Sequence, residues 1–208
     1  MLKVHHLNNS RSQRILWLLE ELGLPYEIVK YQRDSATNLA PDSLKAIHRL
    51  GKSPVIDDGG QIVIESGAII EYIVRKYGKG RLVPKDGTPA AVEYLQLMHY
   101  AEGSAMLPVM LRLYLSRLGE AGKPLEARVV SEIENHMGYL EAELGKQDWF
   151  VANEFSAADI QLSFAIQAAR LLYGLTKFPN LARFLDCIHA RPAYKRALEK
   201  GGTYAFGS

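Results

Sequence analysis

The fold is decided by residues 51–66, which read GKSPVIDDGGQIVIES. Residues 53–57 predict a short strand entered through a proline, and residues 61–65 predict a second strand. The intervening residues 58–60 are typical of a tight hairpin turn, because glycine readily adopts the positive φ angles that such turns need. Ser66 then begins an apolar-periodic stretch. The segment therefore predicts a hairpin followed directly by a helix.

The chain before this hairpin predicts a strand, a helix and another strand. Residues 3–7 predict a short strand. Leucine and isoleucine then recur at helical spacing over residues 15–22, which predicts a helix. Residues 26–31 predict a second strand, and a short helix is expected around residues 42–48. The order β-α-β-(α)-β-β-α predicts a small mixed four-stranded sheet covered by helices.

A glycine- and proline-containing stretch then separates two kinds of sequence. Residues 81–88 are the predicted linker, which gives a first domain of 1–80 and a second of 89–208. Strand signals disappear after the linker, and Pro108 predicts a kink in the first long helix. Ser156 and Asp159 predict a capping box at the start of an apolar helix. The expected helices of this all-α domain are 90–118, 125–144, 157–172, 181–190 and 193–199.

Bulk composition excludes several classes of function. The chain has 208 residues, 48% hydrophobic residues and a net charge of only +2, which does not favour a nucleic-acid partner. Cys187 is the only cysteine, so an internal disulfide is impossible. The sequence from Met1 lacks the apolar stretch of a signal peptide, and its apolar runs are too short to span a membrane. These observations predict a cytoplasmic protein without a membrane partner.

Several segments, in their order and spacing, resemble the glutathione transferase superfamily across nearly the whole chain. They are residues 9–14, 51–55, 65–69, 155–160 and 178–181. The serine before the first helix is more similar to the theta- and zeta-related and bacterial classes than to the tyrosine-using classes. The resemblance implies a thioredoxin-like glutathione-binding domain, a helical domain holding a hydrophobic co-substrate, and a homodimer. Glutathione is the implied co-substrate, and no metal is expected.

The resemblance also implies a set of glutathione-binding residues. Glutathione carries an ammonium, two carboxylates and a thiol. The start of the helix at Ser66 suits the γ-glutamyl carboxylate, because helix N-termini attract anions. Glu65 is expected to pair with the ammonium and Lys52 with the glycyl carboxylate, while Val55 offers backbone groups to the peptide. A cis bond before the proline is also implied. The expected binding set is Lys52, Ser53, Pro54, Val55, Glu65 and Ser66.

Ser10 is the predicted catalytic residue. It lies at the N-terminus of the first helix, where a hydroxyl donor and the helix dipole together favour a thiolate. Outside the family context the same serine is a simple helix cap. Four neighbours remain alternative contacts for the thiol: Ser12, Asn8, Asn9 and His6.

The reaction expected from the resemblance is attack of the glutathione thiolate on hydrophobic electrophiles. Four side chains of the second domain are expected to line an apolar co-substrate pocket: Tyr100, Met106, Met110 and Tyr114. Two alternative functions stay open at this point. One is glutathione-dependent peroxide or disulfide reduction, and the other is a non-catalytic glutathione-binding scaffold. The absence of a Cys-x-x-Cys motif argues against a dithiol mechanism that uses the protein's own cysteines.

Overall fold

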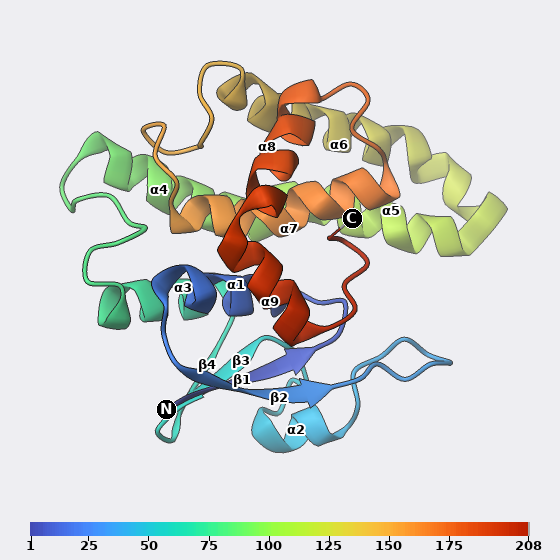
Figure 1. Cartoon of the computed structure of the whole chain (residues 1–208). Coiled ribbons are helices and arrows are strands. Elements are labelled where there is room, and N and C mark those ends of the chain that lie inside the picture. Colours follow the sequence, from blue (N-terminus) through green and yellow to red (C-terminus); the bar gives the residue numbers. More distant parts are fainter. Residues whose placement is uncertain (208) are drawn as a thin grey trace. The chain divides into compact units, whose positions relative to one another are not determined.

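The structure is a computed structural model that describes residues 1–207 and divides into two compact units (Figure 1). Unit 1 contains Met1–Leu82 together with the end of the chain from His189 onward. Unit 2 is the continuous segment Val83–Ile188. The sequence placed the boundary at a linker of residues 81–88, whereas packing also groups the last helix with the N-terminal residues.

The core of unit 1 is the mixed sheet that the hairpin sequence predicts. Its strands are β1 (Leu2–Leu7), β2 (Tyr26–Tyr31), β3 (Val55–Asp58) and β4 (Gln61–Ile64), in the spatial order β2-β1-β3-β4. β1 runs parallel to β2 and antiparallel to β3, which in turn pairs antiparallel with β4. This four-stranded arrangement confirms the predicted thioredoxin-like fold.

Helices cover both faces of this sheet. α1 (Gln13–Leu22) and α3 (Ser66–Tyr77) lie on one face, and the short α2 (Ser43–Ile47) lies on the other (Figure 1). α1 is buried on almost all sides, with a core face that includes Ile15, Leu18 and Leu19. Burying such side chains stabilises the fold by roughly 1.5–3 kcal/mol each.

α9 (Pro192–Gly201) belongs to unit 1 because it packs along α1. Trp17 of α1 meets Tyr194 edge to face, with ring centroids 5.2 Å apart. The nearly buried Glu20 accepts a hydrogen bond from Arg196 Nε at 2.9 Å and also pairs with Lys200. The two helices therefore share both apolar and charged contacts.

Unit 2 is helical, as predicted. Its helices are α4 (Pro89–Tyr100), α5 (Met106–Leu118), α6 (Lys123–Leu144), α7 (Ala157–Leu172) and α8 (Pro179–Ala190), with a 3₁₀ turn at Gly119–Gly122. α7 is buried over most of its length and forms the core of the unit. Its predicted capping box is present. Within residues 1–207, no helix combines the length and apolarity that crossing a membrane requires.

The helix predicted over residues 90–118 is interrupted by a π-helical turn at Ala101–Ala105. This break comes one turn before Pro108, which lies near the start of α5. Proline has no N–H to donate to the carbonyl four residues earlier, and its ring crowds that carbonyl. The irregular turn therefore lies where Pro108 disrupts the ladder, on the N-terminal side of the proline rather than at it.

Candidate functional site

The loop between β1 and α1 is held in one conformation by contacts on two sides. The backbone N–H of Arg33 donates to Asn8 Oδ1 at 2.8 Å, and its guanidinium donates to the carbonyls of Asn8 and Asn9. Asn9 has a positive φ of 49°, and its Oδ1 accepts the backbone N–H of Ala205 at 2.7 Å. Both asparagine side chains, which were alternative thiol contacts, are therefore bonded within the protein.

This loop leads into a buried cluster of His6, Ser10 and Ser12. Ser10 Oγ lies 2.7 Å from Ser12 Oγ, and Ser12 Oγ lies 2.8 Å from His6 Nδ1. The backbone N–H of Ser12 also donates to Ser10 Oγ at 3.2 Å. Burial lowers the pKa of His6 to about 4, so its ring is neutral at physiological pH. The candidates Ser10, Ser12 and His6 thus form one hydrogen-bonded network.

The hydroxyls of this network do not cap α1. Ser12 stands at the N-cap position without a side-chain cap hydrogen bond, and Ser10 Oγ is turned toward Ser12. The positive end of the helix dipole therefore lies beside a hydroxyl that the helix does not use. The N–H groups of Gln13 and Arg14 are bonded to the carbonyls of Ser10 and Arg11, so the feature of this helix start that favours an anion is its dipole.

The start of α3 forms a second polar site. Glu65 has a φ of 67° and a ψ of 120°, an unfavourable conformation for a residue with a side chain. Such strain often marks functional positions. Its exposed side chain lies next to Ser66, which is 4% exposed and whose Oγ accepts Arg14 Nη2 at 2.9 Å.

Arg14 is a residue at this site that the sequence analysis did not include among the expected binding residues. The side chain is 2% exposed and links α1 to the first residue of α3. It brings a buried positive charge to the helix start where an anion is expected. Its spacing from Ser10 was visible in the sequence, but nothing in the pattern indicated that it reaches Ser66.

The segment before β3 lies beside the same cluster. The Ser53–Pro54 bond is cis, as the resemblance implied. Ser53 Oγ donates to the carbonyl of His5 at 2.8 Å, and the N–H of Leu7 is shared between Ser53 Oγ and Ser12 Oγ at 3.2 Å each. Leu7 thus brings the segment of Ser53 next to the serine cluster.

The remaining predicted binding residues differ in exposure. Val55 is buried and has strand partners on both sides, His5 in β1 and Ile64 in β4. Lys52 is exposed and free to reach outward from the protein surface. Val55 is therefore flanked by strands, whereas Ser53 precedes β3.

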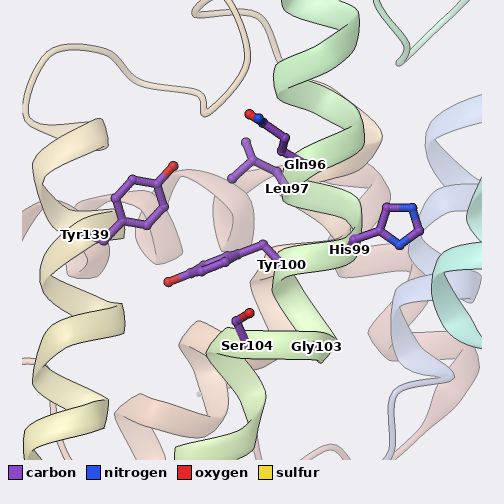
Figure 2. Close-up of a pocket in the computed structure, with 7 residues that line it drawn as sticks. All are labelled: Gln96, Leu97, His99, Tyr100, Gly103, Ser104 and Tyr139. Atoms are coloured by element: carbon purple, nitrogen blue, oxygen red, sulfur yellow. The ribbon is translucent and has the colours of Figure 1, made fainter.

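Unit 2 contains a cavity of about 440 Å³ beside the π-helical turn. Figure 2 shows the ring of Tyr100 pointing toward Tyr139 of α6, while His99 points away. The hydroxyl of Tyr100 lies 2.8 Å from His136 Nδ1, and burial raises the pKa of this tyrosine. The cavity is lined by Gln96, Leu97, His99, Tyr100, Gly103, Ser104 and Tyr139.

Of the four residues predicted for the co-substrate pocket, only Tyr100 lines this cavity. Met106 is buried and Met110 is half-buried. Tyr114 is exposed on α5. The structure does not gather these four side chains in the described cavity.

Comparisons with known proteins agree over nearly the whole chain. Residues 1–75 match the family described as glutathione S-transferase, N-terminal domain, and residues 89–192 match the corresponding C-terminal domain. Glutathione S-transferase 3 of Schizosaccharomyces pombe is 36% identical over 96% of this chain and 88% of its own length.

Two solved structures are also similar. The crystal structure of a glutathione S-transferase from Actinobacillus pleuropneumoniae has a TM-score of 0.90 and 32% identity, covering 99% of this chain and 95% of that one. A glutathione transferase family member from Pseudomonas fluorescens, solved with two glutathione molecules bound, has a TM-score of 0.80 and 27% identity. It covers 95% of this chain and 92% of its own.

Proposed function

Because the chain belongs to the glutathione S-transferase superfamily, we propose that it uses Ser10 to activate the thiol of glutathione for attack on hydrophobic electrophiles. The observation that carries this proposal is the uncapped start of α1 with the Ser10 hydroxyl beside it. A hydroxyl that caps its own helix has no spare function, whereas this one is available to a ligand. We further propose that the protein works in the cytoplasm, in detoxification.

The start of α3 suits the γ-glutamyl end of glutathione. The helix dipole, Ser66 and the buried guanidinium of Arg14 together attract its carboxylate. The exposed carboxylate of Glu65 then pairs with the ammonium, and its strained backbone is explained by the need to hold both groups at one helix start.

The other end of the tripeptide extends along the segment that contains the cis proline. We propose the backbone of Ser53 and Pro54, which precedes β3, as the edge for the cysteinyl unit, because Val55 is already paired with strands on both sides. The sharing of the Leu7 N–H keeps Ser53 beside Ser12. Lys52, which is exposed, is positioned along the chain to meet the glycyl carboxylate. The sulfur then lies near Ser10.

The chemistry requires only a shift in the ionisation of the thiol. A free thiol has a pKa near ~8.5, so little thiolate exists at neutral pH. Lowering that pKa to about 6.5 requires roughly 2.7 kcal/mol, which one charge-assisted hydrogen bond and a helix dipole supply. The thiolate then forms a bond to an electrophilic carbon and displaces its leaving group.

The test compares Ser10→Ala with Ser156→Ala, a second buried serine at a helix start. We expect Ser10→Ala to lower kcat/KM with an aryl halide by about 100-fold, with glutathione still bound, and Ser156→Ala to leave it unchanged. Cumene hydroperoxide in place of the aryl halide separates transfer from reduction. Retention of full activity in Ser10→Ala would contradict the proposed role of Ser10, and a wild type that binds glutathione without any turnover would favour a binding scaffold.

We also propose that the protein is a homodimer, because α5 presents an apolar stripe. Four residues at helical spacing are exposed on one face: Leu107, Leu111, Tyr114 and Leu118. Exposed contiguous apolar surface of this kind commonly marks an interface. Leu111→Glu is expected to halve the mass in light scattering, whereas Ser116→Glu, which is exposed on the same helix outside the stripe, is not. An unchanged mass in Leu111→Glu would exclude this stripe.

This proposed face changes the role expected for Tyr114, which lies in the stripe. Tyr100 is then the predicted pocket residue that still borders a cavity, and we propose it as a contact for the apolar co-substrate. Met106 and Met110 lie in α5, after the π-helical turn that follows Tyr100.

A further inference from the structure

Ser12 Oγ has more close neighbours than one hydroxyl can serve. The N–H of Leu7 donates to it at 3.2 Å, and the carbonyl of Leu7 lies at the same distance. Ser10 Oγ and His6 Nδ1 are closer, at 2.7 and 2.8 Å. A hydroxyl has one proton and two lone pairs. The N–H of Leu7 occupies one lone pair, and the single proton can go to the Leu7 carbonyl or to one of the two side chains. Because the side-chain contacts are shorter, we take Ser12 to donate to one of these two close neighbours and to accept from the other.

The network therefore has two possible directions. In the inward direction Ser10 donates to Ser12 and Ser12 donates to His6. In the outward direction His6 donates from Nδ1 to Ser12, Ser12 donates to Ser10, and the Ser10 proton points away from the cluster. Because Ser10 Oγ also accepts the N–H of Ser12, the inward direction leaves it one lone pair for an outside donor. The inward direction therefore suits a bound thiol, which donates its proton to Ser10. The outward direction suits a bound thiolate, which accepts the proton of Ser10.

The surroundings of His6 favour the inward direction in the free protein. The ring is 2% exposed and neutral, so it has a lone pair to offer. Its Nδ1 already contacts Ser12, and a backbone hydrogen bond to Gly201 favours a proton on the other nitrogen. Lys30, the charged group that acts on the ring, disfavours the imidazolium. With a pKa of about 4, the ring is a weaker base than a thiolate whose pKa is about 6.5, so His6 holds a proton only while a nearby thiolate raises the pKa of the ring.

We propose that His6 is the internal acceptor of the glutathione proton, reached through Ser10 and Ser12. This inference rests on the proposed role of Ser10. The S–H bond breaks and its proton passes to Ser10 Oγ, the Ser10 proton passes to Ser12 Oγ, and the Ser12 proton passes to His6 Nδ1. Sulfur keeps the electron pair. The products are a thiolate and an imidazolium, so the total charge is unchanged.

The transfer reverses the direction of every hydrogen bond in the cluster. Ser10 then donates a hydrogen bond to the thiolate. The same residue therefore first accepts the proton of the thiol and afterwards stabilises the thiolate. When the thiolate is consumed, the imidazolium loses its opposite charge, and burial drives its proton back along the same serines to the product or to water. His6 and Ser12 are positioning residues in this scheme, since Ser10 alone touches the substrate.

The test uses a substitution that keeps the hydrogen bond but cannot take the proton. In His6→Asn the amide oxygen replaces Nδ1 as the acceptor from Ser12. The matched control is His5→Asn, because His5 bonds Tyr31 instead of the serines. Three quantities are measured on glutathione binding: thiolate by ultraviolet absorbance, protons released by calorimetry in two buffers, and the ¹⁵N resonances of His6.

We expect the wild type to form more thiolate than the number of protons it releases, with the His6 resonances moving to imidazolium values. His6→Asn is expected to lose about 10- to 100-fold in kcat/KM and to release one proton for each thiolate formed. His5→Asn keeps the wild-type behaviour. Ser12→Ala, checked for folding by near-ultraviolet circular dichroism, is expected to match His6→Asn.

Two results would overturn the inference. One is a wild type that releases a proton for every thiolate, and the other is a His6→Asn variant with full kcat/KM. If Ser10→Ala still lowers activity in either case, only the route through His6 fails. If the wild type forms no thiolate at all, the proposed role of Ser10 fails with it.

Discussion

The starts of α7 and α1 both contain buried serines, and the two starts are built differently. At α7, Ser156 Oγ accepts the N–H of Ala158, and Asp159 Oδ2 accepts the N–H of Ser156 at 2.7 Å. At α1, Ser10 Oγ accepts the N–H of Ser12, which precedes the helix, and the two serines also bond each other and His6, so no side chain caps the helix itself. In the first arrangement the hydroxyl bonds an N–H of its own helix, whereas in the second the first turn is closed by backbone carbonyls and the hydroxyls also bond side chains.

This difference teaches how a structural serine is distinguished from a functional one. Both serines are about equally buried, at 4% for Ser156 and 5% for Ser10, so burial does not separate them. The two serines are distinguished instead by the groups that their hydroxyls bond. Where the hydroxyl satisfies its own helix, removal costs stability, and where it bonds side chains in a network, removal is expected to cost activity.

The largest effect is expected from breaking the α7 cap. Asp159 is fully buried and also accepts the N–H of Phe150 at 3.0 Å, so Asp159→Ala leaves two buried N–H groups without partners. We expect a loss of about 3–5 kcal/mol in unfolding free energy, measured by urea denaturation. Glu154→Ala, exposed in the preceding loop, is the control. A loss below about 1 kcal/mol in Asp159→Ala would contradict this reading of the cap.

The two starts are also expected to respond oppositely to pH. Burial lowers the pKa of His6 from 6.5 to about 4, so the unfolded chain binds more protons in this range and stability falls as pH falls. Burial raises the pKa of Asp159 from 3.8 to about 6, so the folded chain binds more protons and stability falls as pH rises. Each group contributes at most about 3 kcal/mol.

Urea denaturation between about pH 4 and pH 6 reveals these opposed contributions. Relative to wild type, His6→Asn is expected to make stability fall more steeply with rising pH. Asp159→Asn is expected to have the opposite effect, because only the His6 contribution then remains. Parallel curves for the wild type and both variants would show that neither group titrates differently on folding.

The smallest effect is expected from Ser156→Ala. Loss of an N-cap hydroxyl costs about 1–2 kcal/mol, and here Asp159 still holds the backbone N–H of residue 156. The measurement is the unfolding midpoint in urea, with kcat/KM determined on the same sample. A fall in kcat/KM without a change in stability would remove the contrast with Ser10.

Sequence patterns predicted the elements of the fold but not all of the contacts of the site. The hairpin around Gly59, the helix start at Ser66 and the cap at Ser156 are local features, because each depends on residues within a few positions. The contact of Arg14 with Ser66 joins residues 52 positions apart, and the pairing of Glu20 with Arg196 spans 176. No local periodicity encodes such distances.

The serine cluster lies between these two cases. Ser10 and Ser12 were both visible as candidates, and His6 was a third, yet the sequence offered them as competitors for one bond. The structure places them in a single network, because β1 ends where α1 begins and the turn folds the loop back onto the strand. Sequence patterns identify single candidate residues more readily than they identify hydrogen bonds among those candidates.

The assembly of unit 1 from both ends of the chain has a consequence for synthesis on the ribosome. Unit 2 is continuous and is complete once residue 188 has emerged. Unit 1 must wait for α9, because α9 supplies Tyr194 for Trp17 and two cations for Glu20. Until α9 has been synthesised, the side of α1 that carries Trp17 stays uncovered, so the nascent chain exposes apolar surface there.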